Sequence, residues 1–191
     1  NNGSQPGGVG TDVTSPVITL AAGTEPGSSG TGSTDDTVDF GLTPALAVIG
    51  NLVWADTNND GIKQSTESGI AGLRMELWSP GANGTGENGA GDDVKAASDT
   101  FTDAKGQSYF GNLMDGNYYG RIPAPPVFFP AVSVNAVDAD DGVDNDHNGL
   151  QPGGPGTAVA SPVVNITYGS EPTDDGDGAN ANSTVDFAFA E

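Results

Sequence analysis

The apolar segments of this chain are short, and they are either β-branched and aromatic or alternate with polar residues. Both patterns are typical of β-strands, in which successive side chains point to opposite faces of a sheet. We expect strands at residues 13–22, 37–42, 45–54, 70–78, 97–102, 108–113, 117–122, 127–135, 159–168 and 184–190. Thirty Gly and thirteen Pro indicate many turns and little helix. The pattern predicts an all-β fold. Six aromatic side chains are expected in its core: Tyr109, Phe110, Tyr118, Tyr119, Phe128 and Phe129.

The chain contains an internal repeat. Residues 2–11 align with residues 148–157 at an offset of 146, and Ser15-Pro-Val-Ile aligns with Ser161-Pro-Val-Val at the same offset. After one inserted residue, 37–42 aligns with 184–189. We therefore divide the chain into residues 1–42, a copy of 148–189, and one complete domain at 43–191. Residues 1–42 are either the terminal strands of a preceding repeat or a donor segment that adds strands to a neighbouring subunit.

Residues 56–67 have the oxygen spacing of a calcium-binding loop. Such a loop takes side-chain oxygens from positions 1, 3 and 5, a carbonyl from 7, often a water at 9 and a Glu at 12, with Gly at 6 for the turn. The corresponding residues are Asp56, Asn58, Asp60, Ile62, Gln64 and Glu67, with Gly61 at position 6. The flanking segments are predicted strands, so this loop joins strands and not helices.

A second acidic segment at residues 138–149 is also a candidate for metal binding. Its carboxylates are Asp138, Asp140, Asp141, Asp144 and Asp146. Five carboxylates so close together need a cation or ample water to stay ionised. One or two further calcium ions would satisfy them, although the spacing differs from the twelve-residue pattern. The alternative is a solvated acidic loop.

The calcium-like loop and its flanks resemble the SdrD B-like domain of bacterial surface proteins. The resemblance is carried by Gly50-Asn-Leu-Val-Trp54, the loop, Gly69-Ile-Ala-Gly-Leu73, and the segment from Asp103 to Tyr118, and it covers roughly residues 45–191. It implies an immunoglobulin-like β-sandwich, related to the collagen-adhesin B-type (CnaB) modules, that binds several calcium ions. It also implies tandem arrays on the cell surface.

Charge and residue types exclude several functions. Twenty-six acidic residues against five basic ones give a net charge of -21, which repels nucleic acid and anionic membranes. With no Cys and one His, the chain suits a hard cation such as calcium better than a soft metal. No apolar run is long enough to span a membrane. His147, the only imidazole, lies in the acidic segment and is expected to be structural or exposed, so we expect no enzyme.

We interpret the sequence as a calcium-stabilised structural module of the bacterial cell surface or of a secreted filament. It would act as a stalk, an adhesin segment or a filament subunit, with neighbouring copies of the same module as partners. The absence of an initial Met suggests a processed or excerpted chain. The alternative function is a ligand-recognition module that binds a glycan or a protein through the Gly/Asn-rich loop at residues 79–93.

Overall fold

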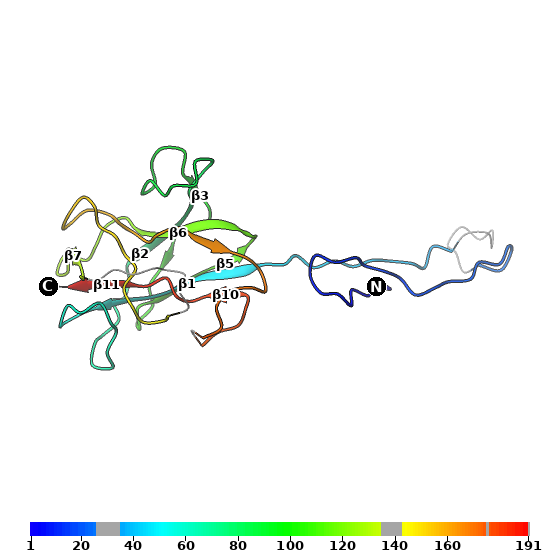
Figure 1. Cartoon of the computed structure of the whole chain (residues 1–191), viewed down its shortest axis with the longest axis horizontal. Helices are drawn as coiled ribbons and strands as arrows, with labels where there is room; N and C mark the ends of the chain where they lie inside the picture. The colour runs from blue at the N-terminus through cyan, green and yellow to red at the C-terminus, as the bar shows by residue number, and fades with distance from the viewer. Residues whose placement is uncertain (26–34, 135–142, 175, 191) are drawn as a thin grey trace. The chain divides into compact units, whose positions relative to one another are not determined.

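The alternating segments of the second part of the chain form strands β1 to β11 (Figure 1). This computed structural model describes residues 1–25, 35–134, 143–174 and 176–190, which contain no helix. The strands are β1 Ala47–Ala55, β2 Arg74–Ser79, β3 Val94–Lys95, β4 Thr100–Phe101, β5 Gln107–Leu113, β6 Gly116–Ile122, β7 Ala131–Val132, β8 Val159–Ala160, β9 Val164–Ile166, β10 Ala181–Asn182 and β11 Phe187–Ala190. They all belong to the unit Leu46–Glu191, which is separate from the unit Asn1–Ala45.

The second unit is a sandwich of two sheets. In the first sheet β1 is central: it pairs antiparallel with β5 and parallel with β10 and β11, and β11 pairs with β7. In the second sheet β2 and β6 are central, with β3 and β4 on β2 and with β8 and β9 on β6. The strands after residue 148 thus enter both sheets, and the fold is all-β as the sequence predicts.

Apolar side chains from both sheets meet in a single core. The largest fully buried ones are Trp54, Tyr119, Phe187, Phe189, Ile49, Leu77, Ile122 and Ile166. Burial of each large apolar side chain stabilises the fold by about 2 kcal/mol. The core therefore lies between β1 and β11 on one side and β2, β6 and β9 on the other.

Two of the expected core aromatics are exposed, so that part of the prediction is wrong. Tyr109 is 46% exposed, on the outer face of β5, and Phe128 is 85% exposed. Phe128 lies in a stretch with prolines at 123, 125, 126 and 130. Proline has no backbone N–H for a ladder, so the strand expected at 127–135 is reduced among the described residues to β7.

The first unit contains no strand in its described residues, although we expected strands at 13–22 and 37–42. A single isolated bridge joins Ser4 and Thr14. An extended segment becomes a strand only when another segment accepts its backbone hydrogen bonds, and a sheet needs several strands to be stable. The residues are suited to strands, but this unit supplies no ladder for them.

Candidate functional site

The acidic loop at residues 56–67 is closed by its own first and last carboxylates. Asp56, which directly follows β1, is only 1% exposed and accepts hydrogen bonds from the amides of Asn59 at 2.7 Å and Gly61 at 2.8 Å. Glu67 is 6% exposed and accepts from the amides of Thr57 at 2.7 Å and Gln64 at 3.0 Å. Both carboxylates therefore point into the loop and order it.

The middle of the loop is held by Asp60. Its carboxylate accepts hydrogen bonds from the amide of Ile62 at 2.9 Å, from Asn58 Nδ2 at 2.8 Å and from Gln64 Nε2 at 3.0 Å. The hydrogen bond from Gln64, with those from Ile62 and Asn58, lowers the pKa of Asp60 below its ordinary value. Four of the predicted oxygen-bearing positions are thereby joined to one another.

The backbone of the loop makes the sharp turn that the spacing requires. Gly61 has φ of 78°, a left-handed conformation that costs glycine little. Asn59 is also left-handed, with φ of 56°, which Asn tolerates better than most residues. The turn brings positions 3, 5 and 9 to one side of the loop, as their shared hydrogen bonds show.

The described end of the second acidic segment lies against this loop. Ile62 forms a β-bridge with Asp146, and the amide of Lys63 donates to the carbonyl of Asn145 at 2.8 Å. A surface hollow is lined by Asp60, Gly61, Ile62, Val143, Asp144, Asn145 and Asp146. The two acidic segments that the sequence singled out therefore share one surface, with Asp60, Asp144 and Asp146 around the same hollow. Asp138, Asp140 and Asp141 lie outside the described residues.

A third acidic cluster, which the sequence analysis did not select, lies in the loop at residues 79–93. Among the described residues, Glu87, Asp92 and Asp93 are the one set of three carboxylates with ligand atoms within 4.8 Å of one another. The carboxylates of residues 56–67 are not that close. Asp92 and Asp93 accept backbone hydrogen bonds within the loop, for example from Ala82 and Glu87. The adjacent Asp92-Asp93 pair is the only sequence signal that pointed to this cluster.

His147 is a structural residue. Its side chain is fully buried, and Nδ1 accepts hydrogen bonds from the amides of Gly149 at 3.3 Å and Ala188 at 3.0 Å. Burial lowers the pKa of His147 to about 4, against the attraction of Asp56. The imidazole is therefore neutral at pH 7 and fixes the chain that precedes β8.

Asp186 is the most deeply buried carboxylate beside the acidic segments. It is 0% exposed, and it accepts hydrogen bonds from the amides of Leu52 and Asn145, each at 2.9 Å. Burial and the nearby charge of Asp144 raise the pKa of Asp186 well above its ordinary value. The carboxyl group of Asp186 therefore holds Asn145 of the second acidic segment close to Leu52 of β1. Its burial disfavours the ionised form.

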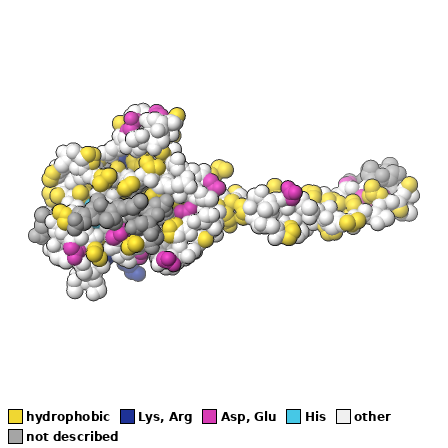
Figure 2. Space-filling view, in the orientation of Figure 1, with side chains coloured by type: hydrophobic (Ala, Val, Ile, Leu, Met, Phe, Trp, Pro, Cys, Tyr) yellow, Lys and Arg dark blue, Asp and Glu magenta, His cyan; other side chains and the backbone are white. Residues whose placement is uncertain are grey.

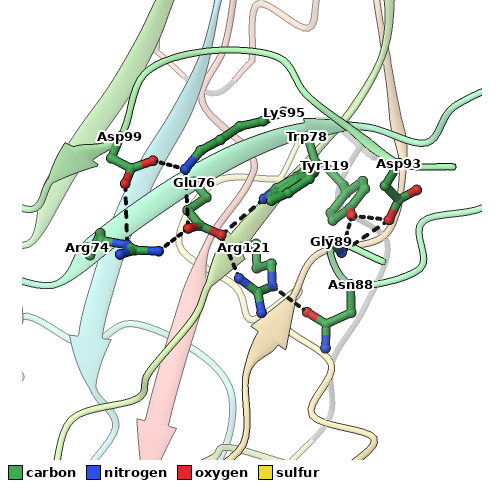
Figure 3. A network of polar contacts seen from close by, with 10 residues as sticks. All are labelled: Arg74, Glu76, Trp78, Asn88, Gly89, Asp93, Lys95, Asp99, Tyr119 and Arg121. Atoms are coloured by element: carbon green, nitrogen blue, oxygen red, sulfur yellow. Dashed lines mark hydrogen bonds and ion pairs between the residues drawn. The ribbon is translucent and has the colours of Figure 1, made fainter. Parts of the chain in front are cut away.

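A different buried carboxylate, Glu76 of β2, is surrounded by basic side chains (Figure 3). It is 2% exposed and forms ion pairs with Arg74, Lys95 and Arg121, three of the five basic residues of the chain. Trp78 Nε1 also donates to it at 3.1 Å. Burial disfavours the charge and is the largest single effect, but these four donors together outweigh it and lower the pKa of Glu76 to about 2.

The fold and the loops define the class of protein: an all-β sandwich module with acidic loops at its surface. A family model for the SdrD B-like domain matches residues 47–170, and the chain belongs to this family. The resemblance read from the sequence is confirmed. The described part of the chain has no helix that is long and apolar enough to cross a membrane.

Two relatives of this chain are much longer proteins of Staphylococcus epidermidis. The chain is 29% identical over 134 residues to serine-aspartate repeat-containing protein F of Staphylococcus epidermidis, covering 70% of this chain and 7% of that protein. It is 34% identical over 120 residues to a fibrinogen-binding protein of the same species, covering 62% and 9%. The chain thus spans less than a tenth of the length of either relative.

One solved structure with some similarity to this chain is the shaft pilin SpaA of Lactobacillus rhamnosus GG. Its sequence identity is 11%, its TM-score is 0.38, and the match covers 78% of this chain and 52% of that one.

Proposed function

We propose that this chain is a calcium-stabilised structural repeat module that acts outside the bacterial cell, as a stalk, an adhesin segment or a subunit of a surface filament. The observation that supports it is the closed loop at residues 56–67, whose buried carboxylates Asp56 and Glu67 face inward without an ion pair to any described Lys or Arg. The function is mechanical: cations join loops that belong to different strands.

The residues of this surface suit calcium. Calcium takes six to eight oxygen ligands from carboxylates, amides, carbonyls and water. Asp56, Asn58, Asp60 and Glu67 provide such oxygens within one loop, with the carbonyl of Ile62 and a water held by Gln64 as the remaining expected ligands. Asp144 and Asp146 add carboxylates from across the hollow, where a second ion would bind. Millimolar extracellular calcium keeps weak sites of this kind filled.

Calcium removal tests the proposal directly. A site filled well above its dissociation constant stabilises the fold by about 2 kcal/mol. For a unit of this size, a chelator is expected to lower the melting temperature by about 4–8 °C per site. The measurement is calorimetry of the 191-residue chain in calcium and in chelator. An unchanged melting temperature would remove calcium from the mechanism.

Two matched substitutions locate the site. Glu67→Gln removes one charge from the loop at residues 56–67 and is expected to lower the melting temperature in calcium by about 3–6 °C, and by much less in chelator. Glu87→Gln removes the same charge from the cluster at residues 79–93 and is expected to leave the calcium-dependent shift unchanged. If Glu87→Gln reduces the calcium-dependent shift and Glu67→Gln does not, the ion binds at Glu87, Asp92 and Asp93.

The ligand-recognition alternative has less support. The loop at residues 79–93 uses its polar groups internally: Asp92 accepts from Ala82 and Asn83, and Asp93 accepts from Glu87 and Gly89. Binding of a glycan or protein that persists in the Glu67→Gln variant and is lost when residues 82–91 are replaced would establish it.

A further inference from the structure

The turn at residues 4–14 has the same contacts as its counterpart at residues 150–160 of the sandwich. The bridge between Ser4 and Thr14 repeats the bridge between Leu150 and Ala160. Gln5 Nε2 donates to the carbonyl of Thr11 at 2.9 Å, and Gln151 Nε2 donates to that of Thr157 at 2.9 Å. The first unit therefore keeps these turns without strand partners.

Asn1 accepts the same pair of hydrogen bonds as its counterpart, the buried His147. Asn1 Oδ1 accepts hydrogen bonds from the amides of Gly3 at 2.9 Å and Gly41 at 3.1 Å. His147 Nδ1 accepts from the amides at the corresponding positions, Gly149 and Ala188. Likewise the amides of Asp39 and Asp186 donate to the side chains of Asn2 and Asn148. The two ends of each copy are held together in the same way.

The copies differ in what covers their apolar side chains. In the sandwich, Val164, Ile166, Phe187 and Phe189 are at most 1% exposed. The counterparts are exposed: Ile18 by 47%, Leu20 by 67%, Phe40 by 50% and Leu42 by 77%. Figure 2 shows hydrophobic side chains on the surface of this unit. An isolated segment with so many exposed apolar side chains is typical of an interaction surface.

The sandwich shows which residues cover this surface. Strands β8 and β9 pair with β6, β10 pairs with β1, and β11 pairs with β1 and β7. All of these partner strands lie within residues 46–146. The polar contacts agree: buried Asp186 accepts from the amides of Leu52 and Asn145, whereas its counterpart Asp39 is exposed.

We propose that residues 1–42 are a preformed last third of a β-sandwich, and that their partner is the first two thirds of a second copy of this module, the part equivalent to residues 46–146. The same part of this chain is not the partner, because residues 148–189 already fill it. The inference rests on the proposed role as a repeat module and is independent of calcium.

The test extends the full chain at its N-terminus. Residues 46–146 are placed directly before Asn1, so that Asn1 stands where His147 follows Asp146. We expect the extended chain to contain two sandwiches. The backbone amides of residues 17–20 and 38–42 should exchange hydrogen about 100-fold more slowly than in the 191-residue chain, because they become part of a sheet. The added residues should also resist protease.

Two single substitutions in the extended chain serve as a matched pair. Phe40→Asp places a charge where Phe187 is buried, and it should abolish both the slow exchange and the protease resistance. Val9→Asp adds the same charge at a position that is exposed in both copies, since Val9 is 64% exposed and its counterpart Pro155 is exposed too. It should change neither. Melting of residues 46–191 should be the same in both variants.

Two outcomes would overturn the proposal. One is equal exchange of residues 1–42 in the two chain lengths, with the added residues digested. The other is self-association of the 191-residue chain with loss of protection in residues 148–189, since residues 1–42 would then displace a resident segment. Failure of the calcium proposal would appear separately, as a sandwich of residues 46–191 whose melting is insensitive to chelator.

Discussion

Glu76 and the pair Asp56 and Glu67 are buried carboxylates that the same sandwich stabilises in different ways. Glu76 is surrounded by the side chains of Arg74, Lys95 and Arg121, so its charge is balanced within the sheet. Asp56 and Glu67 are as deeply buried but accept only backbone amides and the hydroxyl of Thr57 in their described contacts.

The difference underlies the proposal that the loop at residues 56–67 takes a cation from solution. A chain with five basic residues has few internal counterions, and three of them are used at Glu76. Amide hydrogen bonds stabilise the carboxylates at the loop. The ammonium of Lys63 in the same loop donates to the carbonyls of Gln64 at 2.8 Å and Glu67 at 2.7 Å, and not to a carboxylate as the basic residues at Glu76 do. We therefore expect Glu76 to stabilise the fold equally with and without calcium, and the loop at residues 56–67 to stabilise it mainly with calcium bound.

The largest expected effect is that of Glu76→Gln. Removing one member of a buried ion network leaves the other charges uncompensated, at a cost of about 3–5 kcal/mol. Because Arg74 and Lys95 are partly exposed, we expect the lower end, about 3 kcal/mol. The measurement is the free energy of unfolding in denaturant at pH 7, with Glu87→Gln as the exposed control. A loss that differs by more than about 1 kcal/mol between calcium and chelator would contradict the comparison.

How far the sequence predicted these two sites depends on the spacing of their residues. The six residues proposed as ligands at 56–67 lie within one turn-rich stretch, so a linear pattern contains the whole proposed set. The partners of Glu76 come from β2, β3 and β6, and only strand pairing places Lys95 and Arg121 beside it. Pairing registers are not readable from alternation alone, so this network could not be predicted.

The same reasoning explains the errors in the fold. Alternation identified β1, β5 and β6 within two residues because their apolar sides meet a core. It assigned strands to residues 13–22 and 37–42 from the same signal, but a strand also needs a partner, which the described residues of that unit do not provide. The aromatic ring of Phe128 was misplaced because prolines, not alternation, determine its backbone.

Lowering the pH tests the ion network of Glu76, because its stabilising effect depends on the ionised carboxylate. Its pKa is about 2 in the fold against an ordinary value near 4.5, so its stabilisation is complete above pH 4.5 and is lost as the pH falls toward 2. From pH 6 to pH 3.5 we expect a loss of about 1 kcal/mol from this residue. The stability difference between Glu76→Gln and the unsubstituted chain, measured in chelator, should shrink by that amount. A difference that stays constant to pH 3 would show that Glu76 is not ionised as the network requires.

The smallest expected effect concerns the loop at residues 79–93. Tyr119 is fully buried, and its hydroxyl donates to Asp93 and accepts from the amide of Gly89 at 2.7 Å. Burial and the hydrogen bond to Asp93 raise the pKa of Tyr119, so it remains a donor at every pH of interest. Tyr119→Phe should cost about 1 kcal/mol, measured as the free energy of unfolding in denaturant.

Measuring the Tyr119→Phe variant in calcium and in chelator tests whether the third acidic cluster binds an ion. If Glu87, Asp92 and Asp93 bind no ion, the loss of the Tyr119 hydroxyl is purely a matter of local hydrogen bonding and is the same in calcium and in chelator. A cost that grows in calcium would mean that Tyr119 orients Asp93 as a ligand. The loop at residues 79–93 would then depend on a bound cation, as is proposed for residues 56–67. Glu76, by contrast, has its charge balanced by basic side chains of the sheet.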